Sequence, residues 1–100
     1  MKLDIRSDRM APYDRALVRE ASVLMREGWR LRSPDILNEA RHRLAALARL
    51  NPHKLDICTQ AADAERALFR EMKKEGLVRD ALSFAPYIHE ETCPWLSVRK

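Results

Sequence analysis

The sequence predicts an all-α fold: a compact bundle of three main helices plus a short fourth helix, with an irregular tail of aromatic residues and prolines packed over it. Two observations carry this expectation. Apolar residues recur every three or four positions along most of the chain, the period of a helix with one buried face. Only two glycines occur in 100 residues, and each follows such a run. A chain of this length builds one core, so we expect a single helical domain over residues 1–100.

An extended N-terminal segment, residues 1–11, is expected ahead of the helical core at 12–83. Leu3 and Ile5 alternate with charged residues there, which is the period of a half-buried strand. The first helix is predicted over 12–27, where the apolar face is formed by Leu17, Ala21, Leu24 and Met25. The glycine that follows, Gly28, is predicted to end this helix in the left-handed conformation.

The second helix is predicted to begin at Ser33-Pro34-Asp35, because serine is a preferred N-cap, proline fits the first helical position and aspartate favours the positive end of the helix dipole. Asn51-Pro52 repeats this arrangement. We therefore expect a third helix over 52–75, antiparallel to the second and ended by Gly76. Its wide apolar arc predicts contacts with two neighbours and a central place in the fold.

The end of the chain differs from the rest in composition. A short helix is predicted over 77–83, and a tail follows over 84–100. Pro86 and Pro94 prevent a continuous helix in the tail, which contains half of the aromatic residues. Exposing those aromatic residues would be unfavourable, so we expect the tail to pack across the bundle.

Composition restricts the class of protein. The formal net charge is +4, and fourteen arginines stand against five lysines, a bias that suits phosphate or carboxylate partners. The N-terminus lacks the apolar run of a signal peptide, and no stretch approaches the roughly 20 apolar residues of a membrane span. Cys58 and Cys93 do not make a disulfide framework. We therefore expect a cytoplasmic protein without a membrane partner.

Motifs that would indicate an enzyme are missing from the sequence: there is no glycine-rich phosphate loop, nucleophile elbow or HExxH motif. We therefore expect a protein that is not an enzyme and has no cofactor. His53 and Cys58, like His89 and Cys93, form loose pairs rather than the four-ligand set that zinc needs. No metal site is expected, and buried thiols with surface imidazoles explain these residues.

Two classes of function remain. The first is a small regulatory protein that acts by protein–protein contact, such as an inhibitor, antitoxin or adaptor, since small bacterial or phage proteins of this size (anti-CRISPR proteins among them) often act in this way. Its candidate contact residues, beside the arginines of the first helix, are Trp29, Arg30, Arg32, Tyr87 and Trp95. The alternative is a dimeric nucleic-acid-binding transcriptional regulator. Its phosphate contacts would come from a row on the first helix and from the solvent side of the second: Arg15, Arg19, Arg26, Arg41 and Arg49.

One carboxylate lies inside an apolar face. Glu65 falls near the middle of the apolar arc of the third predicted helix, where an unpaired charge would be costly. We therefore expect it to pair with an arginine from another element. A role as a general acid or base is the alternative, but no set of partner groups accompanies it in the sequence.

Two segments resemble known families. Residues 28–40, behind the strand-like residues 2–6, resemble the entry to the second helix of ribbon-helix-helix repressors, which implies that Lys2, Asp4 and Arg6 face bases and that Ser33 meets phosphate. The first helix is longer than in that family, and the third lies beyond its core. Residues 69–80 are similar to the closing part of a pentatricopeptide repeat, with Arg79 in place of the preferred proline and no tandem copy.

Overall fold

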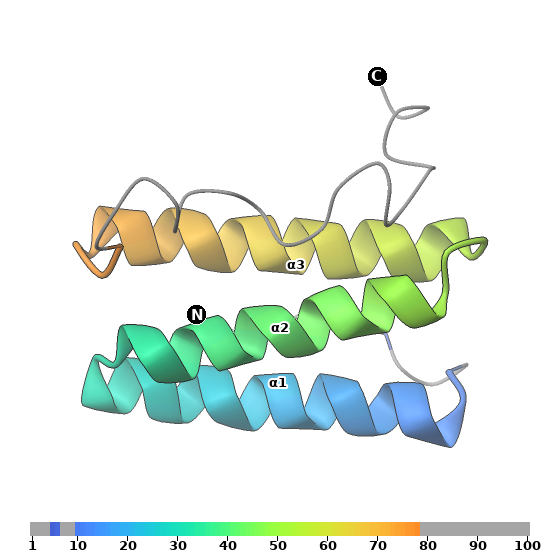
Figure 1. Ribbon diagram of the computed structural model, residues 1–100, viewed down its shortest axis with the longest axis horizontal. Helices are drawn as coiled ribbons and strands as arrows, with labels where there is room; N and C mark the ends of the chain where they lie inside the picture. The colour runs from blue at the N-terminus through green and yellow to red at the C-terminus, as the bar shows by residue number, and fades with distance from the viewer. Residues whose placement is uncertain (1–4, 7–9, 79–100) are drawn as a thin grey trace.

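The computed structural model describes residues 5–6 and 10–78, which fold as three antiparallel helices (Figure 1). α1 spans Pro12–Leu31, α2 spans Pro34–Leu50 and α3 spans Leu55–Lys74. The described residues are thus mostly helical and contain no strand, which confirms the all-α class. Leu77 and Val78, where the short fourth helix was expected to begin, are not helical. Its remainder and the tail lie outside the described residues.

The start of α2 follows the sequence prediction closely. The Ser33 side chain accepts a hydrogen bond from the backbone N–H of Ile36 at 3.3 Å. Pro34 occupies the first helical position, and Asp35 lies in the first turn. Each group satisfies or complements the unpaired N–H groups at the positive end of the helix, so this boundary is fixed by local chemistry.

Gly28 does not end the first helix, and that prediction is wrong. α1 continues to Leu31, and the left-handed residue is Arg32, with φ 49°. The backbone N–H of Ser33 donates to the carbonyl of Gly28 at 2.9 Å, and that of Arg32 donates to the carbonyl of Trp29 at 3.3 Å. These two bonds form a Schellman motif, in which Arg32 takes the position that usually holds glycine.

Gly28 is instead a point of close helix contact. A Cβ atom at this position would lie 2.6 Å from Cδ2 and 2.7 Å from Cγ of Leu37, and 3.2 Å from its backbone nitrogen. Leu37 is fully buried at the start of α2. The missing side chain of Gly28 therefore allows the end of α1 to approach the beginning of α2.

The third helix begins later than predicted. Asn51 caps the end of α2, with its side-chain amide donating to the carbonyl of Leu47 at 2.9 Å and its backbone N–H to that of Ala48 at 3.1 Å. The chain then turns, and α3 starts only at Leu55. Its end agrees with the prediction, since Gly76 has φ 73° and closes a second Schellman motif.

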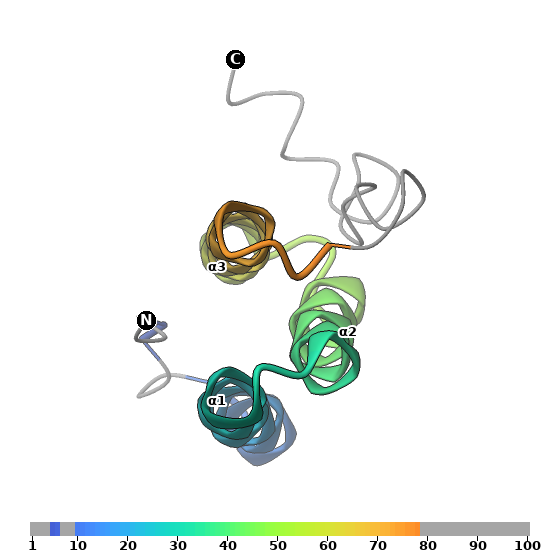
Figure 2. The same cartoon turned by 90° about the vertical axis from the view of Figure 1, so that its left-hand side faces the viewer.

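The central element is α2 rather than α3. α2 packs against both α1 and α3, as the end-on view in Figure 2 makes plain. Seven of its 17 residues are buried, compared with seven of 20 in α3. The prediction that the third helix holds the centre is therefore wrong, because the middle helix of an antiparallel up-down-up arrangement has both neighbours beside it.

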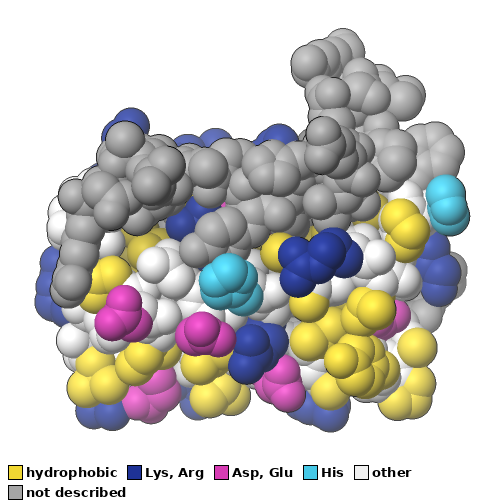
Figure 3. All heavy atoms as spheres, in the orientation of Figure 1, with side chains coloured by type: hydrophobic (Ala, Val, Ile, Leu, Met, Phe, Trp, Pro, Cys, Tyr) yellow, Lys and Arg dark blue, Asp and Glu magenta, His cyan; other side chains and the backbone are white. Residues whose placement is uncertain are grey.

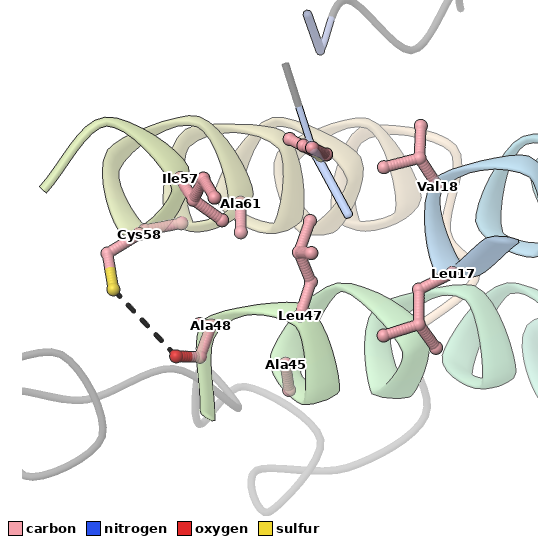
Figure 4. Close-up of a cluster of buried hydrophobic side chains, with 10 residues drawn as sticks. Leu17, Val18, Ala45, Leu47, Ala48, Ile57, Cys58 and Ala61 are labelled. Atoms are coloured by element: carbon pink, nitrogen blue, oxygen red, sulfur yellow. Dashed lines mark hydrogen bonds between the residues drawn. The ribbon is translucent and has the colours of Figure 1, made fainter. Parts of the chain in front are cut away.

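The core is divided into two clusters along the bundle. One lies where the start of α1, the end of α2 and the start of α3 meet; Figure 4 shows it, with members that include Leu17, Val18, Leu47, Ile57 and Ala61. The other lies toward the opposite end and contains Met25, Leu37, Ala40, Leu68 and Met72. The N-terminal segment contributes to the first cluster, because Ile5 packs against it and the backbone N–H of Arg6 donates to Oε1 of Gln60 at 2.7 Å.

Replacing Gly28 with alanine tests the close contact. Alanine favours a helix over glycine by roughly 1 kcal/mol, whereas overpacking a core contact costs about 1–3 kcal/mol. We expect Gly28→Ala to lower the free energy of unfolding by about 1 kcal/mol, measured by urea denaturation followed by circular dichroism.

The control is the same substitution in a Leu37→Ala background, where the blocking atoms are gone. There Gly28→Ala should be neutral or stabilising. An equal loss of stability in both backgrounds would show that the contact with Leu37 is not the cause.

Candidate functional site

The middle of the bundle holds a buried ion pair. Nε of Arg41 donates to Oε1 of Glu65 at 3.0 Å, and Nη2 lies 2.9 Å from the same oxygen. The two side chains are 1% and 0% exposed. Nη1 of Arg41 also donates to Oδ1 of Asn38 at 3.2 Å, and the guanidinium carbon lies 4.6 Å from the centre of the Phe69 ring. The expectation that Glu65 pairs with an arginine of another element is confirmed.

Arg41 is not on the solvent side of the second helix, so that expectation is wrong. Its guanidinium lies between the two core clusters and is used in holding α3 to α2. The sequence did contain a signal for this position. Leu37, Leu44, Ala45 and Ala48 precede and follow Arg41 at helical spacings of four, three, four and seven residues, which puts it on the buried face.

A row of three arginines follows one edge of α1. Arg19 and Arg26 are exposed and Arg15 is half-buried, with Ser22 between them. At 1.5 Å per residue the row is about 16 Å long. None of the three forms an ion pair within the described part of the chain. We call this set the arginine row.

Other arginines of the helices are held in ion pairs. Arg30 donates two hydrogen bonds to Oε2 of Glu27, at 3.2 Å from Nε and 2.6 Å from Nη2. These hydrogen bonds, with the attraction between the two charges, lower the pKa of the Glu27 carboxyl and raise the pKa of Arg30. Nη2 of Arg32 lies 3.6 Å from Oε2 of Glu75 and donates to the Glu75 carbonyl at 3.2 Å.

Trp29 is only partly accessible to a partner. It is half-buried and packs against the second core cluster, together with Leu77 and Val78. Truncating Trp29 would therefore disturb the fold as well as any surface. Tyr87 and Trp95, the remaining aromatic candidates, lie outside the described residues. Arg30 and Arg32 are exposed, but each already has a glutamate partner.

The five arginines proposed for phosphate contact do not share one surface. Arg41 is buried, and Arg49 points away from α1, since it lies roughly 120° around α2 from Arg43, which pairs with Glu20 of α1. Only the arginine row remains together. The sequence interpretation also missed a second exposed basic set on the outer side of α3: Arg66, Arg70 and Lys74.

The residues assigned through the ribbon-helix-helix resemblance are only partly described. Ser33 is the N-cap of α2, and its hydroxyl oxygen accepts from Ile36. Arg6 is exposed, whereas Lys2 and Asp4 lie outside the described residues. Residues 5 and 6 are not in a strand.

An open depression of about 540 Å³ lies between α1 and α2. Its apolar lining comes from Ala16, Val23 and Leu24 of α1. Charged groups surround this lining, because Arg43 of α2 donates to Glu20 at 3.1 Å and to Glu39 at 3.3 Å, and Arg19 lies at its border. The depression therefore combines apolar surface with a network of ion pairs.

The described residues contain no group of three or more histidine, cysteine, aspartate or glutamate side chains placed to hold a metal ion. His53 is exposed. Cys58 is fully buried and disulfide-bonded, so the interpretation of a buried thiol is wrong at this position. Its sulfur lies 3.0 Å from the carbonyl oxygen of Asn51 and 3.8 Å from that of Ala48 (Figure 4). None of the three helices is long and apolar enough to cross a membrane.

Comparisons with known proteins found no matching family model, no matching curated protein and no matching solved structure. Interpretation of the site therefore depends on its own geometry and chemistry.

Removing the buried carboxylate should destabilise the fold. Glu65→Ala leaves the Arg41 guanidinium buried without its counter-charge, and breaking such a pair costs about 3–5 kcal/mol. We expect a loss of this size in urea denaturation, with a smaller loss for Glu65→Gln, which keeps one hydrogen-bond acceptor.

Because Glu65→Ala can approach the total stability of a domain of this size, a double variant provides the control. Arg41→Met combined with Glu65→Leu replaces the pair with apolar groups and should regain most of the lost stability. A Glu65→Ala protein within 1 kcal/mol of the wild type would contradict the structural role given to the pair.

Proposed function

We propose that this protein is a small binding protein that regulates another protein by direct contact, as an inhibitor, antitoxin or adaptor does. Its contact surface is the arginine row on α1, and its partner presents an acidic surface. The observation that carries the proposal is the absence of ion pairs at Arg15, Arg19 and Arg26 within the described residues. By contrast, other arginines of the helical region are each paired with a glutamate: Arg30, Arg32, Arg41 and Arg43.

Arginines that form no ion pair on an ordered helix are suited to bind carboxylates of a partner. The guanidinium group presents a planar set of donors that matches a carboxylate in a bidentate manner. Arginine is also among the residues that contribute most to protein–protein binding energy. Arg15 is half-buried, and the small side chain of Ser22 leaves room for a partner to approach the helix closely.

A protein partner is favoured over nucleic acid by the length of the row. The row is short, because Arg41 is buried and Arg49 points elsewhere. A contact with an acidic protein patch needs only this length, whereas a duplex is usually held by more phosphate contacts.

The partner can be sought by capture from an extract of the cells that encode this chain, after nuclease treatment. Immobilised wild-type protein should retain a partner that the Arg15→Gln, Arg19→Gln, Arg26→Gln variant does not. Since each arginine at an interface centre contributes about 1 kcal/mol or more, we expect the triple variant to bind at least about 100-fold more weakly.

The matched control removes three cations from another surface: Arg66→Gln, Arg70→Gln and Lys74→Gln on α3. Both variants change the net charge by the same amount, so a loss confined to the α1 variant assigns binding to the row. Equal retention by wild type and α1 variant would refute the proposal.

Nucleic acid is tested directly by fluorescence anisotropy with labelled random duplex DNA at about 50 and 200 mM salt. If the row binds an acidic protein, affinity for DNA should be weak at both salt concentrations. If the three arginines instead bind phosphates, the affinity should fall about 40-fold between them, and the α1 variant should lose this dependence. That second outcome would make the protein a nucleic-acid-binding regulator.

A further inference from the structure

A second surface of α1 differs in chemistry from the arginine row. Four of the five large hydrophobic side chains that remain exposed among the described residues are on α1 and α2: Tyr13, Val23, Leu31 and Leu50. They are 67%, 52%, 54% and 53% exposed. At 100° per residue the three on α1 lie within about 80° of one another, on the side where Glu20 meets Arg43 of α2. They therefore lie along the outer seam between the two helices.

We call the outer face of α1 and α2 that carries Tyr13, Val23, Leu31 and Leu50 the seam face. Figure 3 shows hydrophobic side chains gathered over the start of α1 and the end of α2, with charged side chains among them. The open depression lies in the middle of this face. The exposed apolar residues flank it, with Tyr13 and Leu50 toward one end and Leu31 toward the other.

Charge on the seam face is balanced, unlike the charge on the whole chain. The full sequence carries a formal charge of +4. Around the depression, however, two glutamates stand against two arginines: Glu20 and Glu39 with Arg19 and Arg43. Two copies of a basic protein repel each other where both surfaces carry excess positive charge, but not where the charges on the contact surface balance.

We propose that the seam face binds a second copy of this chain through a two-fold axis that passes near the depression, in the plane of the interface and perpendicular to the helices. Such an axis reverses the direction of the helices, so the Tyr13–Leu50 end of one copy meets the Leu31 end of the other. Each apolar end thus covers an apolar end, and Val23 of each copy fills the depression of its partner. The two Glu20–Arg43–Glu39 networks meet at the axis, where each arginine gains a carboxylate of the other copy.

The size of the face is sufficient for a dimer. Helices of 20 and 17 residues are about 30 and 26 Å long, and two side by side cover roughly 600 Å². Two copies would bury about 1,200 Å² in total, the lower end of the range for specific interfaces. We therefore expect a dimer with micromolar affinity. Arg19 of the arginine row also lines the depression, but dimerisation is measured on the purified chain alone and does not require the function proposed above.

The test is the molar mass in solution by sedimentation equilibrium. The wild-type chain should approach twice its 11.7 kDa monomer mass at about 100 µM, while Val23→Glu should remain monomeric. Val23 is half exposed, so the substitution leaves the core intact. The control is Leu55→Glu, which places the same charge at an exposed leucine on α3 and should still dimerise.

A charge exchange tests the two-fold contact itself. Arg43→Glu alone, and Glu20→Arg with Glu39→Arg alone, should each weaken the dimer at least tenfold, because like charges then meet at the axis. Mixing the two variants should restore a mixed dimer. A wild-type chain that stays at 11.7 kDa at about 100 µM, or folded variants that remain monomeric when mixed, would overturn the proposal.

Discussion

The alignment of α3 with α2 depends on one ion pair that is buried away from water. Arg41 and Glu65 lie halfway along the bundle, between the apolar cluster at one end and the apolar cluster at the other. Apolar contacts tolerate sliding, but a buried guanidinium must meet its carboxylate in one register. Asn38 and the Phe69 ring restrict the same group further. The pair therefore selects one alignment of the two helices, and the surfaces of the bundle follow from that alignment.

The sequence predicted those parts of the fold that depend on neighbouring residues. Ser33, Pro34 and Asp35 define the start of α2 by local chemistry, and the positive φ of Gly76 ends α3. Gly28 shows where such reasoning fails. A glycine that follows an apolar run can serve either as a left-handed cap or as the site of a close helix contact. Only the position of Leu37 in the structure shows that Gly28 serves the second purpose.

The candidate site was less predictable than the fold, because the arginine that pairs with a given glutamate can lie far away in the sequence. Glu65 was expected to find an arginine, but nothing in the sequence excludes the others in favour of Arg41 except its apolar neighbours on α2. Which arginines remain without ion pairs is decided by distances between helices. The row of Arg15, Arg19 and Arg26 follows from helical spacing alone, but only the structure shows that these three make no ion pair among the described residues, while Arg41 lies in the core.

The up-down-up connectivity has a consequence for the order in which the molecule assembles. Each helix packs mainly on the next one in the chain, across loops of only a few residues, so most contacts are local in sequence. Chains of this type fold quickly, in microseconds to milliseconds, because little entropy is lost in closing short loops. The bonds from Arg6 to Gln60 and from Arg32 to Glu75 join residues 54 and 43 positions apart. Closing loops of this length costs more chain entropy than closing either hairpin, so we expect these two bonds to form after the hairpins have packed.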